Sequence, residues 1–139
     1  MLALKDLLLR EPALTLATAE SMTCGRIQAR IGAISGASKF FLGGITAYTI
    51  DQKVHHLGVD RALAESCNAV SSEIAEQMAI GACQLFGASL GVATTGYAEN
   101  PVGRTHPFAW WALAHYLGDG RMAVQSGLIE CPGASRTVA

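Results

Sequence analysis

The chain has 139 residues, of which half are hydrophobic and only 15% are charged, with a formal net charge of −1 at pH 7. This length fits one domain with its own core, residues 1–139, and the apolar excess favours a homo-oligomer, in the simplest form a dimer. The balanced charge, without a basic stripe, argues against sequence-independent nucleic-acid binding. No apolar run reaches the roughly 20 residues of a membrane span, and the four cysteines are widely spaced, so we expect a cytoplasmic protein with reduced thiols and no cysteine–histidine metal site.

Hydrophobic runs and turn residues in the first part of the chain predict alternating helices and strands. We expect helix, strand, helix, strand and helix, in that order, over residues 3–10, 15–19, 26–34, 40–48 and 51–57. Gly43 and Gly44 interrupt the second strand, which indicates a bulge or a close approach of another backbone.

The second part of the chain predicts one long helix followed by three strands. Ser71 is a suitable N-cap for a helix that ends at Gly87, with Ile74, Met78, Ala82 and Leu85 on one face. We expect the strands over residues 90–95, 109–115 and 122–130, the last two joined by Gly118-Asp119-Gly120, a hairpin signal. The predicted fold is a three-layer α/β/α sandwich with a mixed, mostly parallel sheet and a late antiparallel hairpin.

Three loops of this predicted fold follow the ends of strands and carry polar or reactive residues. They span residues 20–25, 48–53 and 94–97. Open α/β sheets bind ligands outside the carboxyl ends of their strands, so the three loops together predict a binding site at one edge.

The first of these loops contains candidate nucleophiles. Ser21 lies at a predicted strand-to-helix turn, where the N–H groups of the helix start are suited to stabilise an oxyanion. Capping of the helix by Ser21 or Thr23 is the commoner use of such residues. Cys24 is an alternative nucleophile, since thiols at helix N-termini are readily ionised, but it has no histidine nearby in the sequence.

The second loop contains a candidate base, Lys53. A serine hydroxyl is a weak nucleophile until a neighbouring group accepts its proton, and a lysine with a depressed pKa can do so. A solvated surface lysine is the simpler interpretation. A metal site at His55-His56 is disfavoured because adjacent residues do not share a helix face.

Taken in order, several segments resemble the C-terminal domain of the CinA (competence/damage-inducible) family, which is the nicotinamide-nucleotide amidase family. The matching segments are Glu20-Ser21-Met22-Thr23-Cys24-Gly25, Gly36-Ala37-Ser38, Leu42-Gly43-Gly44, Ala47-Tyr48 with Lys53, Leu57-Gly58-Val59-Asp60, Ala69-Val70-Ser71, Met78-Ala79 with Gly81, and Thr95-Gly96. Each segment alone is weak evidence, but the ordered series is specific and covers residues 14–97.

This resemblance implies hydrolysis of the carboxamide of nicotinamide mononucleotide to nicotinate mononucleotide and ammonia, a step in pyridine-nucleotide recycling. It implies a small nucleotide substrate and no metal or organic cofactor. By position, Ser21 would be the nucleophile, Lys53 its base, and Tyr48 a residue that assists the proton transfer. The implied substrate contacts are Glu20, Thr23, Gly25, Gly43, Gly44, Thr95, Gly96 and Arg136.

The chain departs from the family pattern in three places. After Thr95-Gly96 the family has Ile-Ala-Gly-Pro-Gly-Gly, whereas this chain has Tyr97 and, in place of a glycine, Glu99. The Glu99 carboxylate would repel a phosphate unless a cation such as Arg104 compensates. Met22 and Cys24 stand where the family often has Cys and Gly. The family's last long helix would begin near Ser135-Arg136, so we expect it to be missing from a sequence that stops at Ala139. These departures motivate the alternative hypothesis, a non-catalytic nucleotide-binding or regulatory module.

Overall fold

The structure is a computed structural model that describes residues 3–99, 102–103 and 106–132. The helices are α1 (Leu4–Leu8), α2 (Arg26–Gly32), α3 (Ile50–Leu57), α4 (Arg61–Ser66) and α5 (Ser72–Phe86), with a 3₁₀ turn at Ala37–Lys39. The strands are β1 (Leu16–Glu20), β2 (Phe41–Thr46), β3 (Leu90–Tyr97), β4 (Phe108–Gly118) and β5 (Arg121–Glu130). Arg136, and the position near which the family's last helix would begin, lie outside the described residues.

The five strands form one mixed sheet in the order β2-β1-β3-β4-β5. β1 pairs in parallel with β2 and β3, while β3–β4 and β4–β5 are antiparallel. β5 therefore runs in the same direction as the first three strands, and only β4 is reversed. The turn at Gly118, Asp119 and Gly120 has positive φ at all three residues, as an Asp-Gly hairpin requires. The predicted mixed, mostly parallel sheet with a late hairpin is confirmed.

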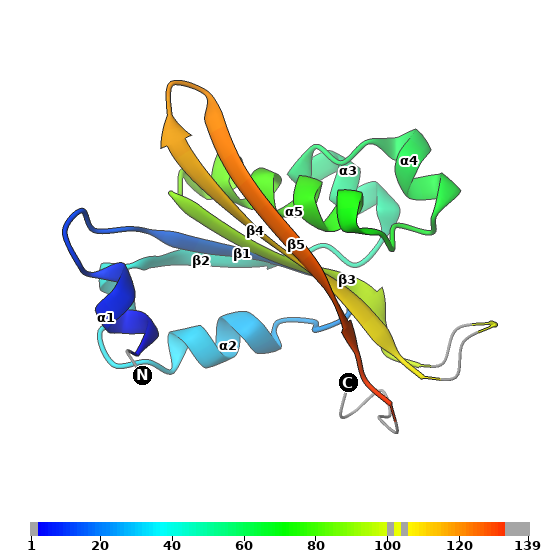
Figure 1. Cartoon of the computed structure of the whole chain (residues 1–139), viewed down its shortest axis with the longest axis horizontal. Coiled ribbons are helices and arrows are strands. Elements are labelled where there is room, and N and C mark those ends of the chain that lie inside the picture. The colour runs from blue at the N-terminus through cyan, green and yellow to red at the C-terminus, as the bar shows by residue number, and fades with distance from the viewer. Residues whose placement is uncertain (1–2, 100–101, 104–105, 133–139) are drawn as a thin grey trace.

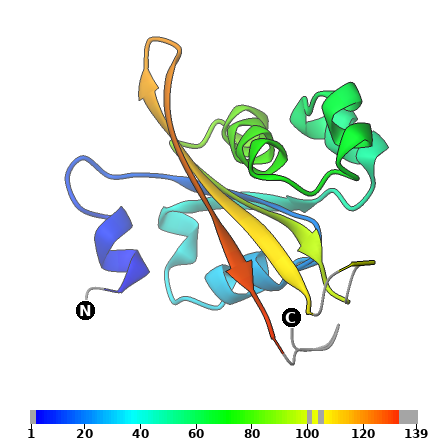
Figure 2. The ribbon, with the colours of Figure 1, turned by 45° about the vertical axis from the view of Figure 1, so that its right-hand side comes forward.

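Helices cover both faces of this sheet, so the predicted three layers are also confirmed. Figures 1 and 2 show α3, α4 and α5 on one side of the sheet and α1 and α2 on the other. The larger core cluster joins the sheet to α5 and includes Ala17, Ala19, Ile74 and Met78. The smaller cluster lies on the opposite face: Leu8, Leu16, Ile31 and Phe40. Successive residues of β1 thus face opposite layers, as strand geometry dictates.

The long helix α5 largely follows its prediction. The Ser71 hydroxyl accepts a hydrogen bond from the Ile74 N–H at 3.2 Å, and Gly87 ends the helix in the left-handed conformation. Leu85 was expected on the buried face but is 46% exposed. Gly81 packs against Leu57, the last residue of α3, and Leu85 lies about one turn further along α5.

Helix α4 is the element that the sequence pattern did not indicate. It has only six residues, too few for a hydrophobic period to be recognised. Its start is nevertheless well defined, because the Asp60 carboxylate accepts a hydrogen bond from the Leu63 N–H at 2.8 Å. Within the described part of the chain, no helix combines the length and the apolarity of a membrane span.

Candidate active site

Ser21 follows the last residue of β1 and is buried at the carboxyl edge of the sheet. The last two residues of β1, Ala19 and Glu20, face opposite layers, and Ala19 lies in the core beside α5. The alternation of the strand therefore places the Ser21 hydroxyl on the α5 side, where it meets α3. Its partner there is Lys53, whose Nζ lies 3.0 Å from Ser21 Oγ.

Lys53 is a buried lysine, with only 2% of its surface exposed, so the surface interpretation is wrong. Its Nζ also donates to the backbone carbonyl oxygens of Ala47, at 2.9 Å, and Tyr48, at 2.8 Å. These two residues follow β2, the neighbour of β1 in the sheet. The ends of two parallel strands and one helix thus converge on a single amino group.

The two carbonyl contacts determine how Lys53 faces the serine. A neutral amine has two N–H bonds and one lone pair, and both N–H bonds can be used by the carbonyls of Ala47 and Tyr48. The lone pair of the neutral amine is then left for the Ser21 hydroxyl, whereas the ammonium form donates a hydrogen bond to Ser21 Oγ. Burial lowers the pKa of Lys53 from 10.5 to about 8, which makes the neutral amine accessible near neutral pH. The pair therefore has the geometry and the proton affinity of a nucleophile with its base.

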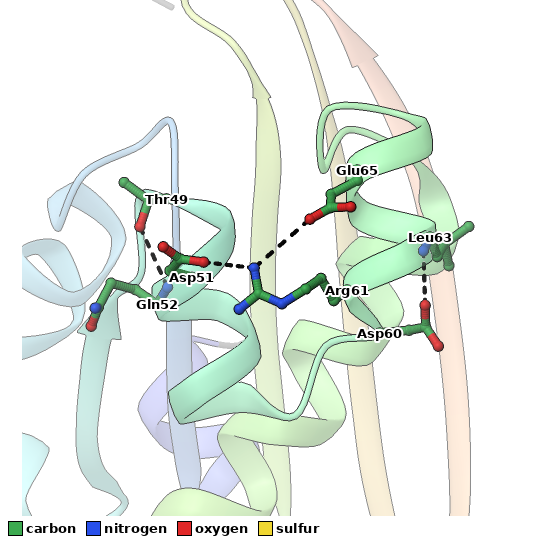
Figure 3. Close-up of polar contacts among 7 residues, drawn as sticks. All are labelled: Thr49, Asp51, Gln52, Asp60, Arg61, Leu63 and Glu65. Atoms are coloured by element: carbon green, nitrogen blue, oxygen red, sulfur yellow. Dashed lines mark hydrogen bonds and ion pairs between the residues drawn. The ribbon is translucent and has the colours of Figure 1, made fainter.

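Helix α3, which carries Lys53, is fixed at both ends. At its start the Thr49 hydroxyl accepts a hydrogen bond from the Gln52 N–H, and Figure 3 shows this cap beside an ion pair between Asp51 and Arg61 of α4, at 2.6 Å. The ion pair is exposed and contributes little free energy. At the other end Leu57 is buried against Gly81 of α5, where a Cβ on the glycine would lie 2.3 Å from the Leu57 carbonyl oxygen. This close packing holds the lysine helix against the core.

A cavity of about 420 Å³ opens beside the Ser21–Lys53 pair. Such a volume falls within the range of small-molecule sites. The residues that line it come from four loops and strand ends: Ser21, Met22, Tyr48, Thr49, Ile50, Lys53, Asn68, Ala69, Val70, Thr95, Gly96, Tyr97, Ala98 and Glu99. The three predicted segments therefore meet, although residues 94–97 form the end of β3 and the prediction that they are a loop is wrong. The structure brings Ser21, Lys53, Tyr48, Thr95 and Gly96 to one cavity.

The segment Asn68-Ala69-Val70, between α4 and α5, is the part of the cavity that sequence reasoning missed. Asn68 and Ala69 both have positive φ, an uncommon conformation for residues other than glycine. The Thr95 hydroxyl donates to the Ala69 carbonyl oxygen at 2.6 Å and ties this loop to the end of β3. No motif marked the segment as functional, because its position depends on a contact between residues 26 apart in the sequence.

Five of the predicted substrate contacts do not line this cavity: Glu20, Thr23, Gly25, Gly43 and Gly44. The Thr23 hydroxyl contacts that of Thr94 at 2.8 Å, and Gly25 is the N-cap of α2. Gly43 and Gly44 lie in β2, and a Cβ on either would collide with a side chain, of Phe86 or of Thr18. The register of β1 on β2 also shifts between Leu16 and Ala17, which pair with Phe41 and Gly43, so the predicted irregularity at these glycines is confirmed.

The start of α2 is occupied by the Glu20 carboxylate, which is fully buried. Its oxygens accept hydrogen bonds from the N–H groups of Gly25, Ile27 and Gln28 at 2.9–3.2 Å. The expectation that Ser21 or Thr23 caps this helix is therefore wrong. These N–H groups are not available to an oxyanion, because a carboxylate from the preceding strand already satisfies them.

Of the remaining candidates, Cys24, His55 and His56 lie away from the cavity, whereas Tyr48 lines it. Cys24 is exposed and does not line the cavity. His55 and His56 are exposed on α3, with ring centroids 4.6 Å apart. Among the described residues no three His, Cys, Asp or Glu side chains are grouped as metal ligands. Tyr48 lines the cavity and is half exposed; its backbone carbonyl, 2.8 Å from Nζ, contacts Lys53.

A second cavity of similar volume lies at the opposite end of the sheet, where β1 and β3 begin. Its lining is mainly apolar and includes Cys83, Tyr116 and Met122. Burial raises the pKa of the Cys83 thiol to about 11, so this sulfur remains protonated and is a poor nucleophile near neutral pH. The Ser21–Lys53 cavity is therefore the better candidate for chemistry.

The fold and this site define a class of protein: an α/β/α domain with a mixed sheet and a buried serine–lysine pair at its carboxyl edge. The model of the CinA C-terminal domain matches residues 3–109, and the chain belongs to this family.

Relatives by sequence and by structure agree with this assignment. A CinA-like protein of Mycobacterium marinum is 41% identical over 120 residues, covering 85% of this chain and 28% of that protein. One from Chlorobium limicola is 36% identical over 133 residues, or 91% of this chain and 30% of that protein. The chain thus spans less than a third of the length of these curated relatives.

Two solved structures show the same fold. The competence/damage inducible protein CihA from Agrobacterium tumefaciens superposes with a TM-score of 0.83 at 30% identity, over 96% of this chain and 79% of that one. A CinA superfamily protein from Escherichia coli gives a TM-score of 0.81 at 28% identity, over 96% and 75% of the two chains.

Proposed function

We propose that this chain hydrolyses the carboxamide of nicotinamide mononucleotide, with Ser21 as the nucleophile and Lys53 as its base. The observation that carries the proposal is the 3.0 Å contact between Ser21 Oγ and Lys53 Nζ, with both residues buried beside a cavity. Burial favours the neutral amine, which can accept a proton, over the ammonium, which cannot. The resemblance to the nicotinamide-nucleotide amidase family supplies the substrate.

The chemistry runs through an acyl-enzyme. Ser21 Oγ attacks the carboxamide carbon while its proton passes to Lys53 Nζ, and the resulting ammonium offsets the negative charge that develops on the carbonyl oxygen. When the C–N bond breaks, Lys53 returns the proton to the leaving nitrogen, which departs as ammonia. A water molecule then attacks the ester carbon and gives a proton to Lys53. The bond from carbon to Ser21 Oγ breaks, the serine recovers that proton, and nicotinate mononucleotide leaves.

The test is release of ammonia from nicotinamide mononucleotide by the purified chain and by Ser21→Ala and Lys53→Met. Each substitution is expected to lower kcat by at least about 10³-fold, because neither member of the pair works alone. Ser38→Ala and Lys39→Met are matched controls, since both residues are exposed and lie away from the cavity. They are expected to keep full activity.

Two results would contradict this proposal. Undiminished turnover in Ser21→Ala would exclude the serine as nucleophile. Binding of nicotinamide mononucleotide by the unmodified chain, without any release of ammonia, would favour the alternative, a non-catalytic nucleotide-binding module. The carboxylate of Glu99 in the cavity lining is the observation that keeps this alternative in view.

A further inference from the structure

The ring of Tyr97 forms part of the cavity lining and is held from two directions. The Asn68 side-chain amide donates a hydrogen bond to the Tyr97 phenol oxygen at 3.2 Å. The ring of Phe108, the residue paired with Tyr97 across β3 and β4, lies 5.4 Å away between centroids at a tilt of 58°. The aromatic ring is thus positioned by two separate segments of the chain before any ligand enters.

The described lining of the cavity holds charged side chains of both signs. Its two charged side chains are Lys53, buried and directed at Ser21 and two carbonyl oxygens, and Glu99, which is exposed. Tyr97 and Glu99 both stand in the segment where this chain departs from the family pattern, which has an isoleucine and a glycine there. An electron-rich aromatic ring such as that of Tyr97 favours a positively charged group.

We propose that Tyr97, positioned by Asn68, selects substrates in which the amide is attached to a positively charged aromatic ring, a pyridinium. The inference rests on the proposed function, because it concerns the amide substrate of the same cavity. A nicotinamide ring that carries a ribose on its nitrogen has this charge, whereas its reduced 1,4-dihydropyridine form has the same amide, ribose and phosphate but no charge. A cation over the face of a tyrosine is attracted by the ring, most strongly where water is excluded.

The first experiment leaves Tyr97 and Asn68 unchanged. Binding of nicotinamide mononucleotide and of its reduced form is measured by titration calorimetry with Ser21→Ala, which prevents turnover. We expect the pyridinium form to bind about 10-fold more tightly, the difference that one desolvated cation–π contact produces. Equal binding of the two forms would overturn the proposal.

Substitutions of Tyr97 and Asn68 then test whether Tyr97 produces this binding preference. Tyr97→Ile, which restores the residue of the family pattern, is expected to reduce the 10-fold preference to about 2-fold or less, by weakening only the charged form. Tyr97→Phe keeps the ring and most of the preference, and Asn68→Ala loses part of it. Tyr116→Ile is the matched control, because this tyrosine lies at the opposite end of the sheet and should leave the preference unchanged.

Kinetics separate selection from catalysis. In an otherwise unmodified chain, Tyr97→Ile should raise KM for nicotinamide mononucleotide about 10-fold while kcat changes less than about 3-fold, because Tyr97 contacts neither Ser21 nor Lys53 by hydrogen bond. Thermal melting followed by circular dichroism checks that each variant is folded. If Tyr97→Ile is not folded, the two single variants Tyr97→Phe and Asn68→Ala take its place. An undiminished preference in Tyr97→Ile, or in Asn68→Ala where Tyr97→Ile does not fold, would overturn the assignment. If the unmodified chain binds the nucleotide but releases no ammonia, the proposed function fails, and the binding preference still decides this inference.

Discussion

The adjacent residues Glu20 and Ser21 serve opposite faces of the sheet. The Glu20 carboxylate accepts N–H bonds from the start of α2, whereas the Ser21 hydroxyl contacts Lys53 of α3 on the other side. The alternation of β1 separates a carboxylate that caps a helix from a hydroxyl that faces the cavity, within two residues. The family motif Glu-Ser therefore joins two side chains with different contacts, one to the start of α2 and one to Lys53.

We expect Glu20→Gln to lower the free energy of unfolding by about 1–3 kcal/mol. The amide retains one acceptor oxygen but loses the charge that stabilises the helix N-terminus, and it brings an N–H₂ group against backbone donors. Urea unfolding measures the change. Glu65→Gln, at an exposed carboxylate of α4, is the control and should stay within about 0.5 kcal/mol. Equal effects of the two substitutions would show that the buried contacts of Glu20 contribute no stability.

The pH dependence of hydrolysis should report the pKa of Lys53. Burial lowers this pKa to about 8, so the neutral amine is the minor form at pH 6 and the major form at pH 9. Because the base must be neutral, kcat/KM is expected to rise about 10-fold per pH unit below pH 7 and to level off above pH 8. Rates measured from pH 5.5 to 9.5 test this. A rate that falls as pH rises through 8 would contradict a neutral lysine as base.

Replacement of Gly81 by alanine should loosen the packing of α3 on α5. A Cβ at this position would lie 2.3 Å from the Leu57 carbonyl oxygen, which is backbone and cannot move aside cheaply. We expect Gly81→Ala to destabilise the protein by about 1–3 kcal/mol and to lower kcat, since α3 carries Lys53. Gly32→Ala is the matched control in α2, where nothing lies within 4 Å of the added Cβ. Thermal unfolding should show a drop for the first variant and none for the second.

Cys24→Gly separates the two candidate nucleophiles. Cys24 has φ of 51°, in the left-handed region that costs a side chain about 1–2 kcal/mol. Glycine relieves this cost, so we expect the free energy of unfolding to rise by up to about 1 kcal/mol. Because Cys24 lies outside the cavity, ammonia release should be unchanged. Loss of activity in a folded Cys24→Gly variant would restore the cysteine as a candidate nucleophile.

Local chemistry predicted much of this fold before any tertiary contact was considered. The Ser71 cap, the Gly87 end of the long helix, and the Asp119 hairpin were all recognisable because each depends on a few neighbouring residues. Helix α4 escaped, since six residues carry too little periodicity. The helix cap of α2 was assigned to the wrong side chain, because its acceptor, Glu20, lies five to eight residues before the donors and in a strand.

The sequence by itself determined that Ser21, Tyr48, Lys53 and Thr95 lie at or near the ends of strands or the start of a helix, and that such ends meet at one edge of an open sheet. Only the tertiary structure decided that Lys53 is buried against Ser21, 32 residues away, with its pKa lowered. It also decided that Asn68 and Tyr97 enclose the same cavity and that Glu20 does not reach it. The physical reason is that spacing along the chain specifies the face of an element, whereas burial and contact depend on which elements pack together.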